Sequence, residues 1–257
     1  MRKGYSQEGL KLIACVSMLL DHIGYLIVYP MYLDASMVNG VDMLGAAAPA
    51  AAKKLYAVYM LLRIMGRLAF PIFCFLLVEG FHRTGSRKGY ALRLAAAALL
   101  SEVPFDLMIS GRIFWIQQSV MVTLLLGFGA LVLMEKCRSL YWKPLAAVPF
   151  ALGAELLLAD YGWVGVAVIA LFELTRYLPT RMASRFFGML ILFHYTPGHI
   201  LEFGGFSVPM QVLGVFSLFF IAWYDGRKLT KSRAVQWAFY LFYPVHILLL
   251  WLISLAI

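Results

Sequence analysis

Long apolar runs separated by short polar connectors fill almost the whole chain. A helix needs about 20 apolar residues to cross the hydrocarbon core of a bilayer. The runs predict about nine such helices, with approximate bounds 10–31, 56–81, 89–109, 119–136, 142–159, 161–178, 185–202, 206–224 and 235–256. The fold class that this pattern favours is an all-α polytopic membrane protein, built as a single transmembrane domain over residues 1–257.

Composition leads to the same class. Hydrophobic residues make up 63% of the chain and charged residues 14%, whereas soluble proteins are about half apolar and a quarter charged. The net charge of +9 resides in short connectors, so it indicates membrane topology and not a nucleic-acid partner. The cysteines have neither disulfide nor metal spacing, and no metal is expected. The first apolar run is too long for a signal peptide and is expected to remain as a span.

Lysine and arginine are distributed unevenly between the two sides of this expected topology. Basic clusters follow every second span, as in HRTGSRKGYALR at 82–93 and DGRKLTKSR at 225–233. Connectors rich in Lys and Arg stay on the cytoplasmic side. The N-terminus is therefore expected in the cytoplasm and the C-terminus outside, in a multi-pass protein of the cytoplasmic membrane.

Ionisable side chains interrupt several of the expected spans. A charge at the bilayer centre costs about 2.5–3.5 kcal/mol, so these groups are expected to face one another or a wet cavity and not lipid. Counting along each span places Asp21, His22, Arg67, Glu102 and His246 at one level, in the middle to outer half of the membrane. The sequence thus predicts a central polar cavity at that depth.

Two pairings follow from this shared depth. Asp21 and His22 point about 100° apart on a helix, so Asp21 is expected to pair with Arg67, either within a functional site or only to hold the fold. His22 needs a partner from another span, and Glu102 is the first choice.

Two other carboxylates lie near the cytoplasmic ends of their spans. Glu79 precedes Arg83 by four residues and Glu173 precedes Arg176 by three, which are spacings that bring side chains together on a helix. Surface ion pairs are the expected role of both. The basic run Arg83–Arg93 is explained by topology alone or as a rim that binds phosphate groups.

Several stretches resemble, in order, the TraX family of membrane proteins. They include LLDHIG at 19–24, GRLAFPIFCFLLVEGF at 66–81, SEVPFDL at 101–107 and YLFYPVHILLL at 240–250. The founding member is the membrane acetylase of F-pilin, and the family is similar to a wider set of integral-membrane acyltransferases. The resemblance implies acetyl-CoA as the donor, taken from the cytoplasm. It also implies an acceptor on the far side, which is an N-terminal amine in F-pilin.

The resemblance also implies roles for particular residues. An essential histidine in an early span of the family matches His22, and a basic segment matches Arg83–Arg93. The residues expected to bind the acetyl-CoA cofactor are therefore Arg83, Arg87, Lys88 and Arg93.

The chemistry of acetyl transfer suggests further assignments. It needs a base for the acceptor's proton, a donor for the developing oxyanion and a site without bulk water. We expect His22 to be the base, oriented by Glu102 or Asp106. His246 and Tyr243 are candidates for the oxyanion donor or for a second proton relay.

Arg67 is expected to hold the carboxylates or the thioester region. The expected catalytic set is His22, Asp21, Arg67, Glu102, His246 and Tyr243. The expected acceptor-side set is Asp106, Gln118, Ser119, Thr123 and Asp160.

A rival function uses the same residue types. A proton-coupled transporter or flippase also needs intramembrane Asp, His and Glu, but such proteins usually show two related halves, and no internal repeat is visible in the sequence. An acetyl-CoA-dependent acyltransferase is therefore favoured, with an amine acceptor preferred over a hydroxyl. The sequence leaves open which exported amine, peptide or glycan is the acceptor, and whether the protein forms a homodimer.

Overall fold

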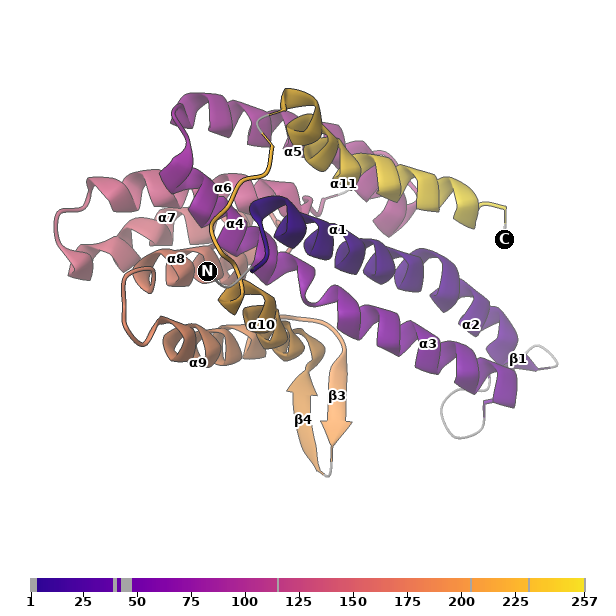
Figure 1. Cartoon of the computed structure of the whole chain (residues 1–257). Coiled ribbons are helices and arrows are strands. Elements are labelled where there is room, and N and C mark those ends of the chain that lie inside the picture. Colours follow the sequence, from indigo (N-terminus) through magenta and orange to yellow (C-terminus); the bar gives the residue numbers. More distant parts are fainter. Residues whose placement is uncertain are drawn as a thin grey trace.

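Helices form most of the chain in the computed structural model (Figure 1), which describes residues 4–38, 41–42, 48–114, 116–203, 205–230 and 232–256. The α-helices are α1 (Gln7–Ile23), α2 (Tyr29–Ser36), α3 (Ala50–Gly66), α4 (Ala69–Arg83), α5 (Arg87–Ser110), α6 (Val120–Lys136), α7 (Lys143–Leu156), α8 (Gly162–Leu174), α9 (Arg181–His194), α10 (Ser217–Ala222) and α11 (Arg233–Ser254). Short strands form two antiparallel pairs among the described residues, β1 (Met37–Val38) with β2 (Val41–Asp42) and β3 (Ile200–Phe203) with β4 (Phe206–Pro209).

The first helix begins where Ser6 caps it and continues beyond its expected end. The Ser6 hydroxyl accepts a hydrogen bond from the Gly9 N–H at 3.1 Å, which satisfies one of the free donors at a helix start. After α1 the chain passes through a π-helical turn, Gly24–Val28, into α2 without a break. Such turns are frequent near functional sites, and this one directly follows His22 and Ile23.

Long apolar helices place the protein in the membrane class. In the part of the chain that the structure describes, three helical stretches are long and apolar enough to cross a bilayer: Gln7–Ser36, Ala50–Arg83 and Ala234–Ser254. Gly162–Leu174 and Met210–Ala222 are apolar but shorter. The count of nine spans and their orientation stay predictions.

The region 185–224 differs from the two helices expected there. After α9, strands β3 and β4 form a hairpin, and a 3₁₀ segment, Met210–Phe216, precedes the short α10. Pro197 and Gly198 stop α9, because proline lacks a backbone donor and Gly198 has a φ of +137°. Gly205, with a φ of +89°, lies in the hairpin turn, where glycine is tolerated best. In Figure 1 the hairpin projects from the bundle.

Helix α4 is buried on nearly all sides and forms the core of the bundle. It packs against α1, α6, α8 and the 3₁₀ segment. The large side chains buried around it include Phe81, Phe128, Phe172 and Phe193, from α4, α6, α8 and α9. A helix that is apolar all round belongs in such a central position.

Two buried carboxylates near the end of α4 join neighbouring helices. Glu79 accepts from Arg176 at 2.6 Å and from Arg83 at 3.1 Å, while Glu173 contacts His82 at 2.6 Å. The expected pair of Glu79 with Arg83 is confirmed, but Arg176 pairs with Glu79 and not with Glu173. Both carboxylates are buried, so the expectation of surface pairs is wrong, because α4 and α8 face each other here.

Glu79→Gln should lower stability far more than a matched change at the surface. It leaves Arg83 and Arg176 without their charged partner, and breaking a buried pair costs about 3–5 kcal/mol. The control is Glu135→Gln, which breaks the ion pair between Glu135 and Arg87. These two side chains are 44% and 39% exposed, and an exposed ion pair contributes about 0–1 kcal/mol to stability. Thermal unfolding of the purified variants measures the difference, and equal midpoints would contradict this interpretation.

Candidate functional site

A pocket of about 350 Å³ runs through the bundle beside α1. Gln7 and Lys11, near the start of α1, line one end, and Pro197, after α9, lines the other. Asp21 and His22 line it between these ends. The pocket therefore contacts three ionisable side chains of the first helix, Lys11, Asp21 and His22.

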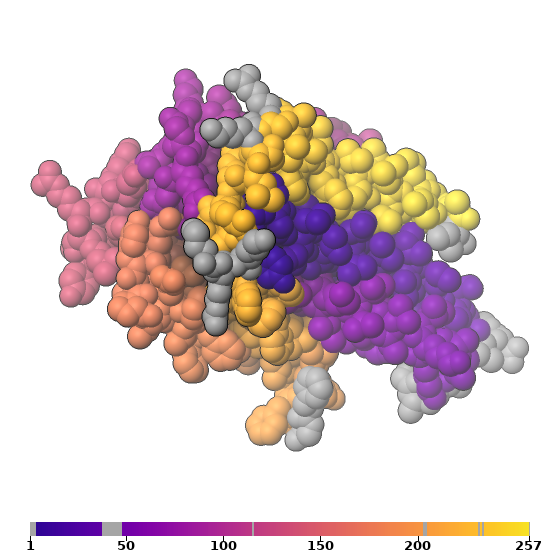
Figure 2. All heavy atoms as spheres, viewed as in Figure 1, coloured from indigo at the N-terminus to yellow at the C-terminus, as the bar shows by residue number. Residues whose placement is uncertain are grey.

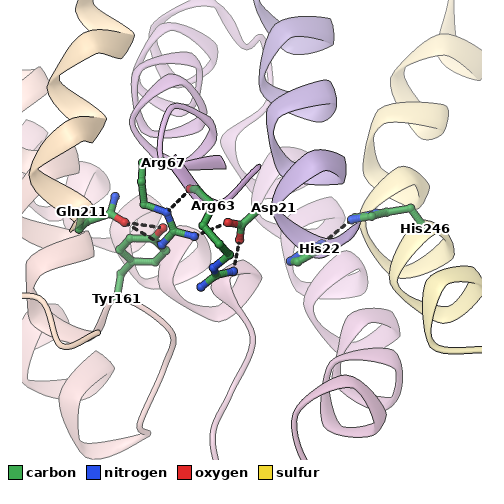
Figure 3. A network of polar contacts seen from close by, with 7 residues as sticks. All are labelled: Asp21, His22, Arg63, Arg67, Tyr161, Gln211 and His246. Atoms are coloured by element: carbon green, nitrogen blue, oxygen red, sulfur yellow. Dashed lines mark hydrogen bonds and ion pairs between the residues drawn. The ribbon is translucent and has the colours of Figure 1, made fainter. Parts of the chain in front are cut away.

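His22 and His246 form a hydrogen-bonded pair between the first and the last helix (Figure 3). His22 Nδ1 lies 2.7 Å from His246 Nε2, and His246 Nδ1 lies 2.6 Å from the backbone oxygen of Phe242. Since a carbonyl oxygen only accepts hydrogen bonds, His246 Nδ1 carries a proton and donates it. In the neutral His246 ring Nε2 is then the acceptor, so His22 Nδ1 donates to it.

This series of hydrogen bonds leaves His22 Nε2 with an unprotonated lone pair. His22 lines the pocket, whereas His246 is only 5% exposed and is not among the residues that line it. A neutral imidazole with one nitrogen fixed as donor is the form that a general base requires. The site can thus accept a proton at one defined atom.

Asp21 is held by two arginines (Figure 3). Arg63 Nη1 donates to Asp21 Oδ2 at 2.8 Å, and Arg67 Nη2 donates to Oδ1. The Asp21–Arg67 ion pair is present as expected. Arg67 Nη1 also donates to Gln211 Oε1 at 3.1 Å, and the Tyr161 hydroxyl donates to the same oxygen at 3.3 Å. The network therefore links the first helix to α3, α8 and the 3₁₀ segment.

The helix break at Arg67 positions this network. α3 ends at Gly66 and α4 begins at Ala69, and Arg67 Nε donates to the backbone oxygen of Arg63 at 3.0 Å, which satisfies a carbonyl at the helix end. A side chain at Gly66 would overlap Cβ and Oδ1 of Asp21. Glycine at this position therefore lets α1 and α3 approach closely enough for the ion pairs.

Glu102 and Asp106 contact other partners than His22, so the expectation that one of them orients it is wrong. Glu102 Oε1 accepts from the Ser119 hydroxyl at 2.7 Å and from the Ser119 N–H at 3.3 Å, at the start of α6. Asp106 Oδ2 accepts from the Phe114 N–H at 3.0 Å. Both carboxylates fasten the connection between α5 and α6, and a second histidine takes the place expected for Glu102.

Of the expected acceptor-side residues, all of which the structure describes, Asp160 lines the pocket and the others do not. Ser119 and Thr123 are fully buried, and the Thr123 hydroxyl donates to the backbone oxygen of Asp160. Gln118 donates through its N–H to Leu158 O at 3.1 Å and accepts from Asp160 N–H at 2.9 Å. These contacts join the α5–α6 connection to the α7–α8 turn.

The four basic residues expected to bind acetyl-CoA lie outside the lining of this pocket. Arg83 and Arg93 pack over tyrosine rings, Arg87 is held in an ion pair, and Arg87 and Lys88 line a separate groove. None of the four lines the pocket, although Arg93 packs over Tyr90, which does. Lys11 is the basic side chain that lines the end of the pocket at the start of α1.

Comparison with known proteins agrees with the sequence motifs and the helical fold. The family model described as TraX protein matches residues 6–254. The chain belongs to the TraX family. The probable fimbrial assembly protein FimC, serogroup H1, of Dichelobacter nodosus is 30% identical over 209 residues, which cover 75% of this chain and 82% of that protein. No solved structure matches the chain significantly.

The TraX match includes every element that supplies the site, from α1 with His22 to α11 with His246. The pocket and network of this TraX chain also contain residues outside the expected sets: Lys11, Arg63, Tyr161 and Gln211. Two of them, Arg63 and Gln211, can be recognised as candidate site residues from the sequence. Arg63 lies four residues before Arg67, on the same helix face, and Gln211 is a lone amide in the apolar run VPMQVLG.

Proposed function

We propose that this TraX-family protein is a membrane acetyltransferase. It moves the acetyl group of cytoplasmic acetyl-CoA to an amine or a hydroxyl on the extracytoplasmic side of the inner membrane. The free Nε2 of His22, in a pocket that extends along α1, is the observation that supports this most. The FimC relative is named as a fimbrial assembly protein, which fits an exported acceptor such as a pilus subunit.

We propose that two substrates approach His22 from opposite ends of the pocket. Gln7 and Tyr25 both line it, and at about 1.5 Å per residue the helix between them measures roughly 27 Å. The hydrocarbon core of a bilayer is about 30 Å thick. A thioester arm that enters beside Gln7 and an acceptor that enters beside Pro197 would meet near His22.

In the proposed reaction His22 takes up one proton and returns it. Its Nε2 takes the proton of the acceptor's amine or hydroxyl as that group attacks the thioester carbonyl carbon. The tetrahedral intermediate then breaks its C–S bond, and His22 returns the proton to the sulfur of CoA. His246 stabilises the protonated ring by accepting from Nδ1. A positioned base of this kind contributes about 10²–10⁴-fold to the rate.

The Tyr243 hydroxyl is the oxyanion donor that the geometry favours. Tyr243 lines the pocket, and its ring lies 6.3 Å from that of His22, centroid to centroid. Its hydroxyl is a donor that can face an oxyanion formed beside His22. Arg67 already donates from three nitrogens, and His246 donates to a backbone oxygen. Of the two roles expected for His246, the proton relay therefore fits better.

The donor's phosphates are assigned to the pocket end that Lys11 lines. Lys11 Nζ lies over the Phe239 ring, 5.1 Å from its centroid. Glu8, one turn earlier, accepts from the N–H groups of Leu229 at 2.9 Å and Thr230 at 3.4 Å, so its oxygens are already engaged. Lys11 can therefore offer its charge to a phosphate at the entrance.

Lys11→Gln should raise the KM for acetyl-CoA about tenfold and leave kcat nearly unchanged, because a hydrogen bond to a charged group is worth about 1.5–3 kcal/mol. Steady-state release of the CoA thiol by the purified protein measures both constants. The control is Arg138→Gln, which removes an exposed charge from the connector after α6. An unchanged KM for Lys11→Gln, or an equal rise for Arg138→Gln, would contradict the assignment.

The function itself is tested with protein reconstituted in phospholipid vesicles. Acetyl-CoA is supplied on the side where α1 begins, and a short peptide with a free N-terminal amine on the other. Thiol release and acetylated peptide in the mass spectrum are expected, together with stabilisation of about 2.7 kcal/mol when acetyl-CoA is at 100 times its Kd. A proton-coupled transporter would show neither, and that result would overturn the proposal.

A further inference from the structure

A second groove lies on the surface of α6, between α5 and α7, and has a volume of about 460 Å³. Its floor is formed by one face of α6, with the residues Leu125, Phe128, Gly129, Val132, Leu133 and Lys136. These positions are three and four apart and so share one side of the helix. Its walls consist of Arg87, Lys88 and Ala91 from α5 and Phe150 from α7.

The groove is apolar along its length and basic at one end. The α6 residues in it carry no charge until Lys136, the last residue of that helix. Arg87 and Lys88 lie in the first turn of α5 and line the same groove. Arg87 is paired with Glu135, so Lys88 and Lys136, both exposed, add positive charge beyond that pair.

The length of the groove matches one leaflet of a bilayer. From Leu125 to Lys136 the helix rises about 16 Å at 1.5 Å per residue, and half of a hydrocarbon core of about 30 Å is about 15 Å. The charge bias of the sequence assigns the basic end to the cytoplasmic surface. Anionic lipid headgroups attract Lys and Arg at that surface.

We propose that this groove binds an anionic phospholipid of the cytoplasmic leaflet. One acyl chain lies along the apolar face of α6, and the headgroup phosphate lies between Lys88 and Lys136. A coenzyme phosphate would offer the same ionic chemistry, but a polar pantetheine arm gains nothing from a floor of Leu, Phe and Val. Among the described residues, the groove shares no lining residue with the pocket of His22, so this proposal is independent of acetyl transfer.

The test measures lipid bound to the full-length protein after purification in a neutral detergent. Dioleoylphosphatidylglycerol and dioleoylphosphatidylcholine are added at equal concentrations, and retained lipid is counted by native mass spectrometry. The wild type should retain phosphatidylglycerol preferentially. Lys88→Gln/Lys136→Gln should reduce that retention on the order of tenfold, because each basic residue near an anionic headgroup contributes to binding.

The matched control is Arg138→Gln/Arg181→Gln, which removes the same charge from exposed positions outside the groove. It should retain the lipid as the wild type does. Ala91→Phe adds bulk to one wall and should reduce retention while both lysines remain. Far-UV circular dichroism checks that each variant keeps its helical content.

Four results would overturn the proposal. The wild type could retain both lipids equally, or the control could lose as much lipid as the double variant. Inorganic phosphate could displace the lipid as well as a second phospholipid does, which would make the apolar floor irrelevant. Finally, Lys88→Gln/Lys136→Gln could raise the KM for acetyl-CoA and leave lipid retention intact, which would assign these lysines to the coenzyme.

Discussion

His22→Ala should abolish acetyl transfer while leaving the protein folded. Without the imidazole the acceptor keeps its proton, and kcat is expected to fall about 10²–10⁴-fold, the usual contribution of a positioned base. Release of the CoA thiol by purified protein measures the loss. His194→Ala is the matched control, because His194 is exposed at the end of α9 and should keep the wild-type rate.

Substitution of His246 distinguishes a role in proton relay from a purely structural contact. His246→Ala removes the acceptor for His22 Nδ1, so the His22 ring is free to take either tautomer. A smaller loss of kcat is expected, together with a displaced pH profile of kcat. If His246→Ala keeps both the rate and the profile of the wild type, the relay is refuted. If His22→Ala retains full transfer, the base assignment is refuted as well.

Asp21→Asn should lower the unfolding midpoint strongly. The change leaves Arg63 and Arg67 close together without the carboxylate that both contact. These side chains are partly buried, and the loss of one partner from a fully buried ion pair, about 3–5 kcal/mol, is the upper bound of the cost. Thermal unfolding in detergent measures the effect. The expected order is wild type, then the charge-restoring double variant, then Asp21→Asn.

The double variant Asp21→Asn/Arg63→Gln supplies the control. It returns the site to its original net charge and should recover part of the lost stability, since residues in one network do not act additively. A stable Asp21→Asn protein without activity would mean instead that the carboxylate takes part in the reaction. The sequence left these two roles of Asp21 open, and this pair of variants separates them.

The depth of each site residue along its helix can be predicted from the sequence. Helices rise by a constant amount per residue, so counting placed Asp21, Arg67 and His246 at one level, and the structure joins Asp21 to Arg67 and His22 to His246. Depth does not fix the direction in which a side chain points around its helix. Glu102 is predicted at the same depth and nevertheless contacts Ser119, because the packing of α5 against α6 decides its direction.

The hairpin of β3 and β4 shows a second limit of prediction from the sequence, which concerns the membrane spans. Apolar runs of helical length predicted two spans there, but Pro197, Gly198 and Gly205 interrupt the helix. These residues are visible in the sequence, but hydropathy alone does not weigh their effect on the backbone. The residues expected to bind acetyl-CoA do not line the pocket of His22, because charge bias shows which side a basic segment occupies and says nothing about which cavity it borders.

The pairing of His22 with His246 has a consequence for biosynthesis. The two residues are 224 positions apart, and α11, which carries the second, is synthesised after every other helix described above. A chain interrupted before α11 has no acceptor for His22 Nδ1 and lacks one wall of the pocket. If the protein transfers acetyl groups as proposed, a nascent chain without α11 is expected to be inactive, so acetyl-CoA would not be consumed before α11 is inserted.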